Sequence, residues 1–252
     1  MPEERPILEA VLFDAGGTLV RIDFEWVSER LSAHGVRVAW QALRAAEING
    51  RQSYDESLNG RRGEEPAPSD ASQPLGSAGD NQRYYIGMLA SAKVPVNVIE
   101  KVVAEMQERH RERGLWSRPA EGARKAIDDV AALGLRMAVV SNSDGRAEQH
   151  LIESGVRDGI EFVVDSQHVG IEKPDPRILG IALERMKVDA SRALYVGDIR
   201  SVDEEAAAAA GMHFVLLDPY ANYGQDIETL PTIGDLADYI RMTYTPQSAT
   251  WG

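Results

Sequence analysis

The stretch LFDAGGTLV, residues 12–20, ends a run of apolar residues at an acidic side chain, Asp14. Residues 7–13, ILEAVLF, are rich in large aliphatic residues and nearly continuous in apolar character. This pattern is typical of a strand whose two faces are both covered. A carboxylate at the end of such a strand is costly to place without a function. Asp14 is therefore the first candidate for a catalytic residue.

Four later segments have the same apolar character, and helical patterns lie between them. These predicted strands are RMAVVS (136–141), EFVVD (161–165), ALYVGD (193–198) and HFVLLD (213–218). Several of the helical patterns stop at a glycine, which commonly follows the last turn of a helix. Another begins at KPDPRI, where Asp175 is the predicted N-cap and Pro176 the first helical residue. Strands that alternate with helices predict an α/β fold with a parallel sheet and right-handed crossovers.

In a sheet of this kind the ligand lies at the carboxyl ends of the strands, near the point where the strand order reverses. The predicted strands end, in chain order, at Asp14, Ser141, Asp165, Asp198 and Asp218. We therefore expect at least three of these strand ends to converge on one site.

The stretch 22–115 departs from this alternation and has apolar residues at helical spacings of three and four. We predict a Rossmann-like core made of residues 1–21 and 116–252, with a helical domain of residues 22–115 inserted after the first strand. Within the insertion, residues 59–81 are rich in Gly, Pro, Ser and Asp, which favours a mobile or disordered loop. The alternative is a loop that closes over the active site and selects substrates.

Composition and charge exclude several classes of protein. The chain has no cysteine, which excludes disulfides, thiolate metal sites and a cysteine nucleophile. The N-terminus lacks the basic start of a signal peptide, and no run approaches the ~20 apolar residues that a membrane helix needs. We therefore expect a cytoplasmic protein. The formal net charge of −13 argues against nucleic acid and anionic membranes as partners, and an anionic substrate would need local positive charge.

Four segments carry the candidate chemistry: LFDAGGTLV with Asp14, VVSNSDG with Ser141, GIEKPDP with Lys173, and YVGDIRSVDEEAAAAAG with Asp198 and Asp203. An aspartate at a strand tip can act as a nucleophile. A second carboxylate suits Mg2+, which takes carboxylates and bridges phosphate oxygens. A lysine supplies a point charge for a phosphoryl oxygen and for the nucleophile, and a serine hydroxyl can donate a hydrogen bond.

The four segments, in this order and with a helical insertion between the first two, resemble the haloacid dehalogenase-like hydrolase superfamily. The resemblance implies that Asp14 is a nucleophile that becomes an aspartyl-phosphate, and that the helical insertion is the family's cap domain. It implies a Mg2+ site formed by Asp14, Asp198 and the backbone carbonyl of Gly16, with Asp203 supporting this site. It further implies that a small phosphorylated substrate is bound by Ser141, Asn142 and Lys173.

The sequence differs from the family's phosphatases at Gly16, where they usually carry an aspartate that acts as general acid and base. Glycine keeps the carbonyl ligand but removes the proton carrier, and the loss of such help typically costs ~10²–10⁴ in rate. Asp23, Glu25 and His168 are candidates for a replacement acid by their positions in the sequence.

Three interpretations remain open. The first is a Mg2+-dependent phosphatase that handles good leaving groups or takes its acid from elsewhere. The second is a metal-independent haloacid dehalogenase, because the family's dehalogenases also lack the second aspartate. Those dehalogenases carry uncharged polar residues at the position of Asp198, so we rank the dehalogenase interpretation below the phosphatase interpretation. The third is a catalytically weak protein that binds a phosphorylated ligand or a partner. Taken singly, each candidate residue could instead have a structural role, as an acidic residue in the first turn of a helix, a turn residue or a solvated surface lysine. Their joint occurrence at strand ends favours a functional site.

Overall fold

The computed structural model of the 252-residue chain describes residues 5–59, 78–221, 223 and 226–247. The chain forms two compact units. The first consists of residues 1–21 and 118–252, and the second of residues 22–117. The chain thus returns to the first unit at residue 118, where the sequence analysis placed the boundary at 116.

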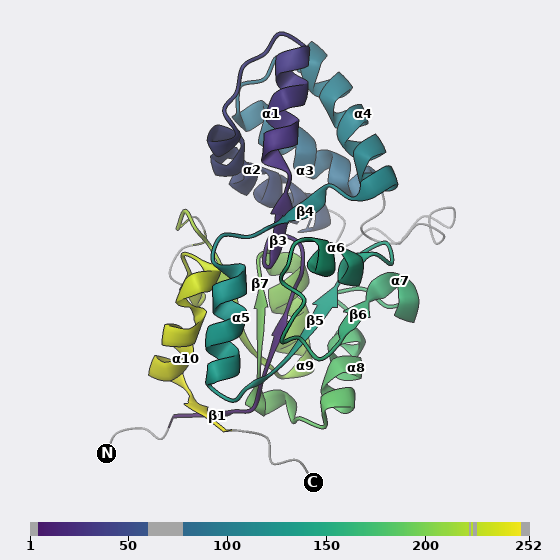
Figure 1. Cartoon of the computed structure of the whole chain (residues 1–252). Helices are drawn as coiled ribbons and strands as arrows, with labels where there is room; N and C mark the ends of the chain where they lie inside the picture. The colour runs from purple at the N-terminus through teal and green to yellow at the C-terminus, as the bar shows by residue number, and fades with distance from the viewer. Residues whose placement is uncertain (1–4, 60–77, 222, 224–225, 248–252) are drawn as a thin grey trace. The chain divides into compact units, whose positions relative to one another are not determined.

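A six-stranded parallel sheet forms the centre of the first unit (Figure 1). Its strands lie in the order β6–β5–β2–β7–β8–β9. They are β2 (Ala10–Phe13), β5 (Arg136–Ser141), β6 (Val163–Asp165), β7 (Ala193–Gly197), β8 (His213–Leu217) and β9 (Thr229–Leu230). The chain adds β5 and β6 on one side of β2 and then β7, β8 and β9 on the other. The strand order therefore reverses between β2 and β7, and ligands bind at such reversals in α/β sheets.

Helices cover both faces of this sheet, with α5 and α10 on one side and α8 and α9 on the other (Figure 1). The helices of the unit are α5 (Ala123–Ala132), α6 (Ala147–Glu153), α7 (Ser166–Val169), α8 (Arg177–Met186), α9 (Glu205–Ala210) and α10 (Leu236–Thr243), with short 3-10 turns at Ala190–Arg192 and Ile233–Asp235. Ala10 and Leu12 of β2 share one core with residues of α8 and α9. Their neighbours Val11 and Phe13 are also fully buried, and successive strand residues point to opposite faces. Both faces of β2 are thus covered, which explains its continuous apolar sequence.

The predicted α/β class and parallel sheet are confirmed, and the differences lie at the ends of elements. The predicted strand 7–13 is two strands, because β1 (Ile7–Leu8) leaves the main sheet to pair with β10 (Thr245–Pro246). The predicted strand 161–165 begins at Val163. Helix α8 has Pro176 at its N-cap, one residue later than predicted, and the Asp175 carboxylate accepts the N–H of Arg177 at 3.0 Å.

The helical pattern VDEEAAAAAG (202–211), which follows the predicted strand 193–198, does not begin as an α-helix. Residues Arg200–Glu204 form a π-helix, and α9 continues from Glu205. Such wider turns are rare and occur frequently at functional sites.

The second unit has four helices in the part of the chain that the structure describes, and its range includes the predicted helical insertion. The helices are α1 (Phe24–Ala33), α2 (Trp40–Asn59), α3 (Ala78–Ser91) and α4 (Val96–Arg113). At the two crossings between the units, β3 (Val20–Ile22) pairs with β4 (Trp116–Pro119). Residues 60–77, most of the predicted loop 59–81, lie outside the described residues, and the rest of that range belongs to α2 and α3. No helix in the described ranges is long and apolar enough to cross a lipid bilayer.

Candidate active site

The strand ends around the reversal lie at one edge of the sheet. Phe13 of β2 is in register with Val196 of β7, and the N–H of Asp14 donates to the carbonyl of Val196 at 2.8 Å. Asp198 follows one residue after β7 ends, and β5, on the other side of β2, ends at Ser141. Since the strands are parallel, the chain brings these carboxylates and the serine to the same edge, as the sequence predicted.

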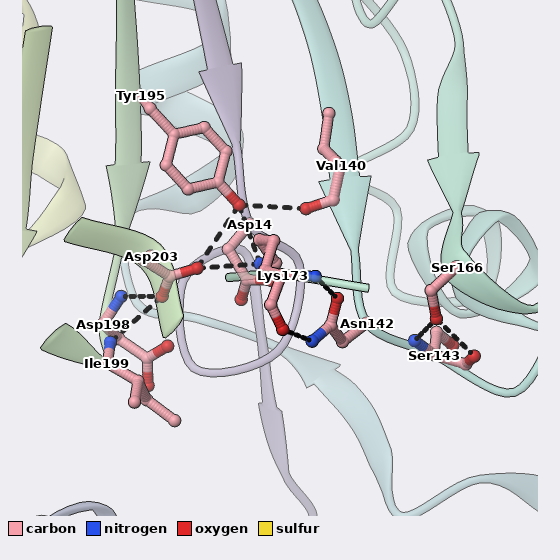
Figure 2. A network of polar contacts seen from close by, with 10 residues as sticks. All are labelled: Asp14, Val140, Asn142, Ser143, Ser166, Lys173, Tyr195, Asp198, Ile199 and Asp203. Carbon is pink, nitrogen blue, oxygen red and sulfur yellow. Dashed lines mark hydrogen bonds and ion pairs between the residues drawn. The ribbon is translucent and has the colours of Figure 1, made fainter. Parts of the chain in front are cut away.

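The ammonium group of Lys173 lies among three oxygen atoms of this edge (Figure 2). Its Nζ donates to Oδ1 of Asp14 at 2.6 Å, to Oδ1 of Asp203 at 2.7 Å and to the hydroxyl of Tyr195 at 2.7 Å. Lys173 is only 2% exposed. A charge buried to this degree requires such partners, so Lys173 is not the solvated surface lysine that the sequence left open.

Asp203 connects Lys173 to the end of β7. Its Oδ2 accepts the N–H groups of Asp198 and Ile199, each at 3.0 Å, while its Oδ1 accepts from Lys173. A Cβ atom added to Gly197 would lie 2.4 Å from Cγ of Asp203. The π-helix and this glycine therefore let the carboxylate come close to the strand end, where both of its oxygens are used by the protein.

The loop after Asp14 packs directly against Asp198. Gly17 adopts the left-handed backbone region, with φ 83°, and its N–H donates to the carbonyl of Val20 at 2.7 Å. A Cβ atom on Gly17 would lie 2.1 Å from Oδ2 of Asp198. Glycine is thus required here both for the backbone conformation and for the close approach. The preceding residue, Gly16, forms an isolated bridge with Val20.

The electrostatics of this edge are dominated by burial and by the lysine. Burial raises the pKa of Asp14 from 3.8 to about 6, against the lowering effect of Lys173, and the negative charge of Asp203 adds to the rise. Burial alone would lower the pKa of Lys173, but Asp14 and Asp203 outweigh it and hold this pKa well above 10.5. Burial likewise raises the pKa of Tyr195 well above 10.0, so its hydroxyl keeps its proton.

Three carboxylates of this edge could hold a cation. One oxygen each of Asp14, Asp198 and Asp203 lies within 4.8 Å of the others, and all three residues are buried. The ammonium group of Lys173 forms ion pairs with two of these carboxylates, those of Asp14 and Asp203. Both oxygens of Asp203 already accept hydrogen bonds, one from Lys173 and the other from two backbone N–H groups.

Asn142 holds the backbone of Lys173 in both directions (Figure 2). Its Nδ2 donates to the Lys173 carbonyl at 2.9 Å, and the Lys173 N–H donates to its Oδ1 at 2.8 Å. The side chain that the sequence analysis assigned to substrate binding is thus engaged in fixing the lysine.

The rest of the loop after β5 is tied to β6 and α7. The Ser166 hydroxyl accepts the N–H of Ser143 and donates to its carbonyl, each at 3.1 Å. The Asp165 carboxylate accepts the N–H groups of Gly145 and Ala147, both at 3.1 Å. Asp165, a predicted strand-end acid, therefore orders the loop that follows Ser141.

The family model of the haloacid dehalogenase-like hydrolases matches residues 8–211, which include the second unit and a portion of each segment of the first unit. The chain belongs to this family. The resemblance carried by the four sequence segments is therefore confirmed.

This haloacid dehalogenase-like hydrolase spans less than half the length of the curated relatives that it matches. The haloacid dehalogenase-like hydrolase domain-containing protein 3 of Mus musculus is 42% identical over 97 residues, 38% of this chain and 39% of that protein. The phosphoglycolate phosphatase of Rhodospirillum rubrum is 34% identical over 117 residues, 46% of each chain. A dehalogenase crystal structure with an intermediate complex has a TM-score of 0.63 at 19% identity and covers 93% of this chain and 97% of its own. At this identity the likeness shows the fold alone.

The candidates for a replacement acid lie in two places in the chain. Asp23 caps α1: its Oδ1 accepts the N–H of Trp26 at 3.1 Å, and its Oδ2 accepts from Arg109 at 2.7 Å. Glu25 lies in the first turn of the same helix. Both belong to the second unit, whereas His168 lies in α7 of the first. Helix capping and an ion pair account for Asp23.

Sequence reasoning missed one residue of the site, Tyr195. It lies within β7 and is fully buried, and its hydroxyl meets Lys173. The available signal was a hydroxyl inside the apolar run ALYVG, since a buried tyrosine usually finds a hydrogen-bond partner.

Proposed function

We propose that this hydrolase is a Mg2+-dependent phosphatase that transfers the phosphoryl group of a small molecule to Asp14. The observation that carries the proposal is the pair of buried carboxylates, Asp14 and Asp198, at the strand reversal, with Lys173 bonded to the first. The 34% identity to a phosphoglycolate phosphatase over part of the chain supports the same reaction class.

The donor set of the site fits Mg2+. Asp14 and Asp198 would supply carboxylate oxygens and Gly16 its backbone carbonyl, which are the hard oxygen ligands that this ion prefers. When bound, Mg2+ would offset negative charge on the phosphoryl oxygens and on the nucleophile.

The protein's own residues would then carry two displacements. A carboxylate oxygen of Asp14 forms a bond to phosphorus while the bond from phosphorus to the leaving oxygen breaks. Water then attacks the phosphorus of the aspartyl-phosphate, which releases inorganic phosphate and restores the carboxylate. Lys173 keeps Asp14 in place, and the Ser141 hydroxyl with the ordered loop after it would donate to the phosphoryl oxygens.

Gly16 restricts which leaving groups suit the site. Without a carboxyl group at this position, an alcohol would leave with its full negative charge, which is slow. The carboxylate of an acyl phosphate, or the phenolate of an aryl phosphate, leaves without first taking a proton. We therefore propose that acyl and aryl phosphates are better substrates than alkyl phosphates. We assign the role of substrate selection to the helical unit of residues 22–117, as the cap domain.

The alternative is a metal-independent haloacid dehalogenase, and Gly16 is the observation that favours it. Displacement of halide from carbon by Asp14 needs no proton on the leaving group. Asp198 argues against this, because a second buried carboxylate beside the nucleophile repels an anionic haloacid unless a cation lies between them.

The test compares acetyl phosphate, p-nitrophenyl phosphate, glycerol 1-phosphate and 2-chloropropionate, with Mg2+ and with EDTA. We expect the wild type to hydrolyse the first two only with Mg2+, and Asp14→Asn to lose at least ~10³ in rate. Gly16→Asp should raise the rate on glycerol 1-phosphate by ~10²–10⁴ and leave that on acetyl phosphate nearly unchanged. Asp128→Asn, at an exposed helix position, is the control. Full phosphatase activity in Asp14→Asn, or halide release that is independent of Mg2+, would contradict the proposal.

A further inference from the structure

Asp165 lies beside Ser141 in the parallel sheet. The two residues are register partners, and each ends its strand, β6 and β5 respectively. Neighbouring strands are about 4.8 Å apart, so Asp165 stands next to the serine whose hydroxyl would donate to the phosphoryl oxygens. Asp165 is only 3% exposed. A carboxylate buried to this degree needs hydrogen-bond donors inside the protein.

The donors are backbone N–H groups from two segments. Oδ1 of the carboxylate accepts from Gly145 at 3.1 Å and from Gln167 at 3.0 Å, and Oδ2 accepts from Ala147 at 3.1 Å. Gly145 has φ 91°, a left-handed conformation that glycine adopts at little cost. The carboxylate therefore bridges the loop of residues 142–147, which follows Ser141, and the first turn of α7.

The next residue, Ser166, holds the same loop at another point (Figure 2). Its hydroxyl accepts the N–H of Ser143 and donates to the carbonyl of the same residue. Ser166 is 2% exposed, so this pair is also inside the protein. Asn142 ties the beginning of the loop to the backbone of Lys173. The loop is thus fixed at residues 142, 143, 145 and 147, and Asp165 and Ser166 hold the last three of these.

We propose that Asp165 and Ser166 are positioning residues for the phosphoryl group, because they keep the loop after Ser141 in the conformation that binds it. This role rests on the proposed phosphatase function. The carboxylate of Asp165 has two opposite effects on an anionic ligand. Its negative charge, one strand away from Ser141, repels the anion, whereas its three hydrogen bonds preserve the loop. The second effect is the larger one.

Two variants separate these effects. In Asp165→Asn the charge is lost, and an NH2 group replaces one of the accepting oxygens, so at least one of the three N–H groups loses its acceptor. Loss of the charge alone would tighten phosphate binding, and loss of the loop's hydrogen bonds would weaken it. Ser166→Ala removes both bonds to Ser143 and changes no charge.

Gly211→Ala is the control for a loss of stability without a change at the site. Gly211 lies between α9 and β8, at the edge of the sheet where the strands begin, and has φ 73°. A side chain at this position strains the backbone but meets no other atom within 4 Å. An effect of lower stability alone would therefore occur in this variant too.

The first measurement is amide hydrogen exchange, followed by NMR without any ligand. In Asp165→Asn the N–H of Gly145 or of Ala147 should exchange about 10-fold faster than in Gly211→Ala, because it has lost its acceptor. In Ser166→Ala the same change is expected for the N–H of Ser143. Exchange in both variants equal to that in the control would overturn the proposal.

The second measurement uses inorganic phosphate and acetyl phosphate, both with Mg2+. In Asp165→Asn and in Ser166→Ala we expect the Kd of phosphate, by calorimetry, and the KM for acetyl phosphate to rise about 10-fold, with kcat within about threefold of wild type. Gly211→Ala should keep the wild-type Kd and KM. Unchanged or tighter phosphate binding in Asp165→Asn would overturn the proposal, and so would an equal rise of Kd in Gly211→Ala.

The remaining outcomes separate this role from the proposed function. If Asp165→Asn does not fold, Ser166→Ala decides, and a wild-type Kd in that variant would overturn the proposal. If the wild type neither binds phosphate nor hydrolyses acetyl phosphate, the proposed function fails and the positioning role fails with it. If the wild type does both and the two variants bind phosphate equally well, only the positioning role is refuted.

Discussion

Asp14→Asn removes a buried negative charge and leaves the shape of the side chain nearly unchanged. The amide oxygen can still accept from Lys173, which now donates to Oδ1 of Asp14. Burial raises the pKa of the Asp14 carboxyl to about 6, so the folded protein holds this proton more tightly than the unfolded chain. The stability of the wild type therefore falls as pH rises from below 4 through about 6 and stays constant above that range. The Asp14→Asn variant has no carboxyl group to titrate at this position, so its stability does not fall in this pH range for this reason.

The size of the effect follows from the two pKa values. The difference between 3.8 and about 6, at 1.36 kcal/mol for each pH unit, amounts to about 3 kcal/mol at pH 7.5. We therefore expect Asp14→Asn to be the more stable protein by up to about 3 kcal/mol in the absence of metal. For domains of roughly this size, 1 kcal/mol shifts the melting temperature by about 2–4 °C. The proposed nucleophile thus lowers stability, as expected for a charge that is buried for function.

The assay is thermal and urea unfolding of both proteins in EDTA, from pH 4 to pH 8. The difference in melting temperature should be near zero at pH 4, grow through pH 6 and level off above it. Added Mg2+ should narrow it, because a ligand that binds only the folded wild type stabilises that protein alone. Asp128→Asn, which removes an exposed carboxylate, should show no such dependence. If Asp14→Asn is less stable than wild type at pH 7.5 in EDTA, the reasoning is wrong.

Three further predictions concern other groups. Gly17→Ala and Gly211→Ala both force a side chain into the left-handed region, but only the first meets another atom, Oδ2 of Asp198 at 2.1 Å. Each variant should lose about 1 kcal/mol of stability to backbone strain. Gly17→Ala should in addition bind Mg2+ at least about 10-fold more weakly than Gly211→Ala, as measured by calorimetry. Equal Mg2+ affinities of the two variants would contradict this prediction. Asp203→Leu leaves a buried ammonium and two backbone N–H groups without their acceptor, so urea unfolding should show a loss of about 3–5 kcal/mol. Burial lowers the pKa of His150 below 6.5, so the stability that the neutral imidazole contributes is lost as pH falls below that value. The free energy of unfolding of His150→Phe should therefore depend less on pH between 7 and 5 than that of the wild type. Identical pH profiles of the two proteins would contradict this prediction.

The sequence was sufficient to predict the fold class and the sheet edge where the candidate site lies. Continuous apolar strands separated by helices require a parallel sheet, and this patterning is local, so it can be read without knowing the path of the chain. The position of Asp14 and Asp198 one residue past their strands then places both at the same edge. The limits of elements were less predictable, because pairing decides them: Ile7 and Leu8 form a separate strand only because the C-terminal residues Thr245 and Pro246 lie beside them.

The partners within the site depended on the tertiary structure. Lys173 and Asp14 are 159 residues apart, and no spacing in the sequence shows that they bond through Oδ1. The hydroxyl of Tyr195, within a strand that is apolar elsewhere, acquires a role only when the loop carrying Lys173 packs over β7. Periodicity and strand ends are properties of a local segment, so the sequence by itself determined which acids share an edge. Hydrogen-bond partners are set by how distant segments pack, so only the tertiary structure decided that Lys173 bonds to both Asp14 and Asp203.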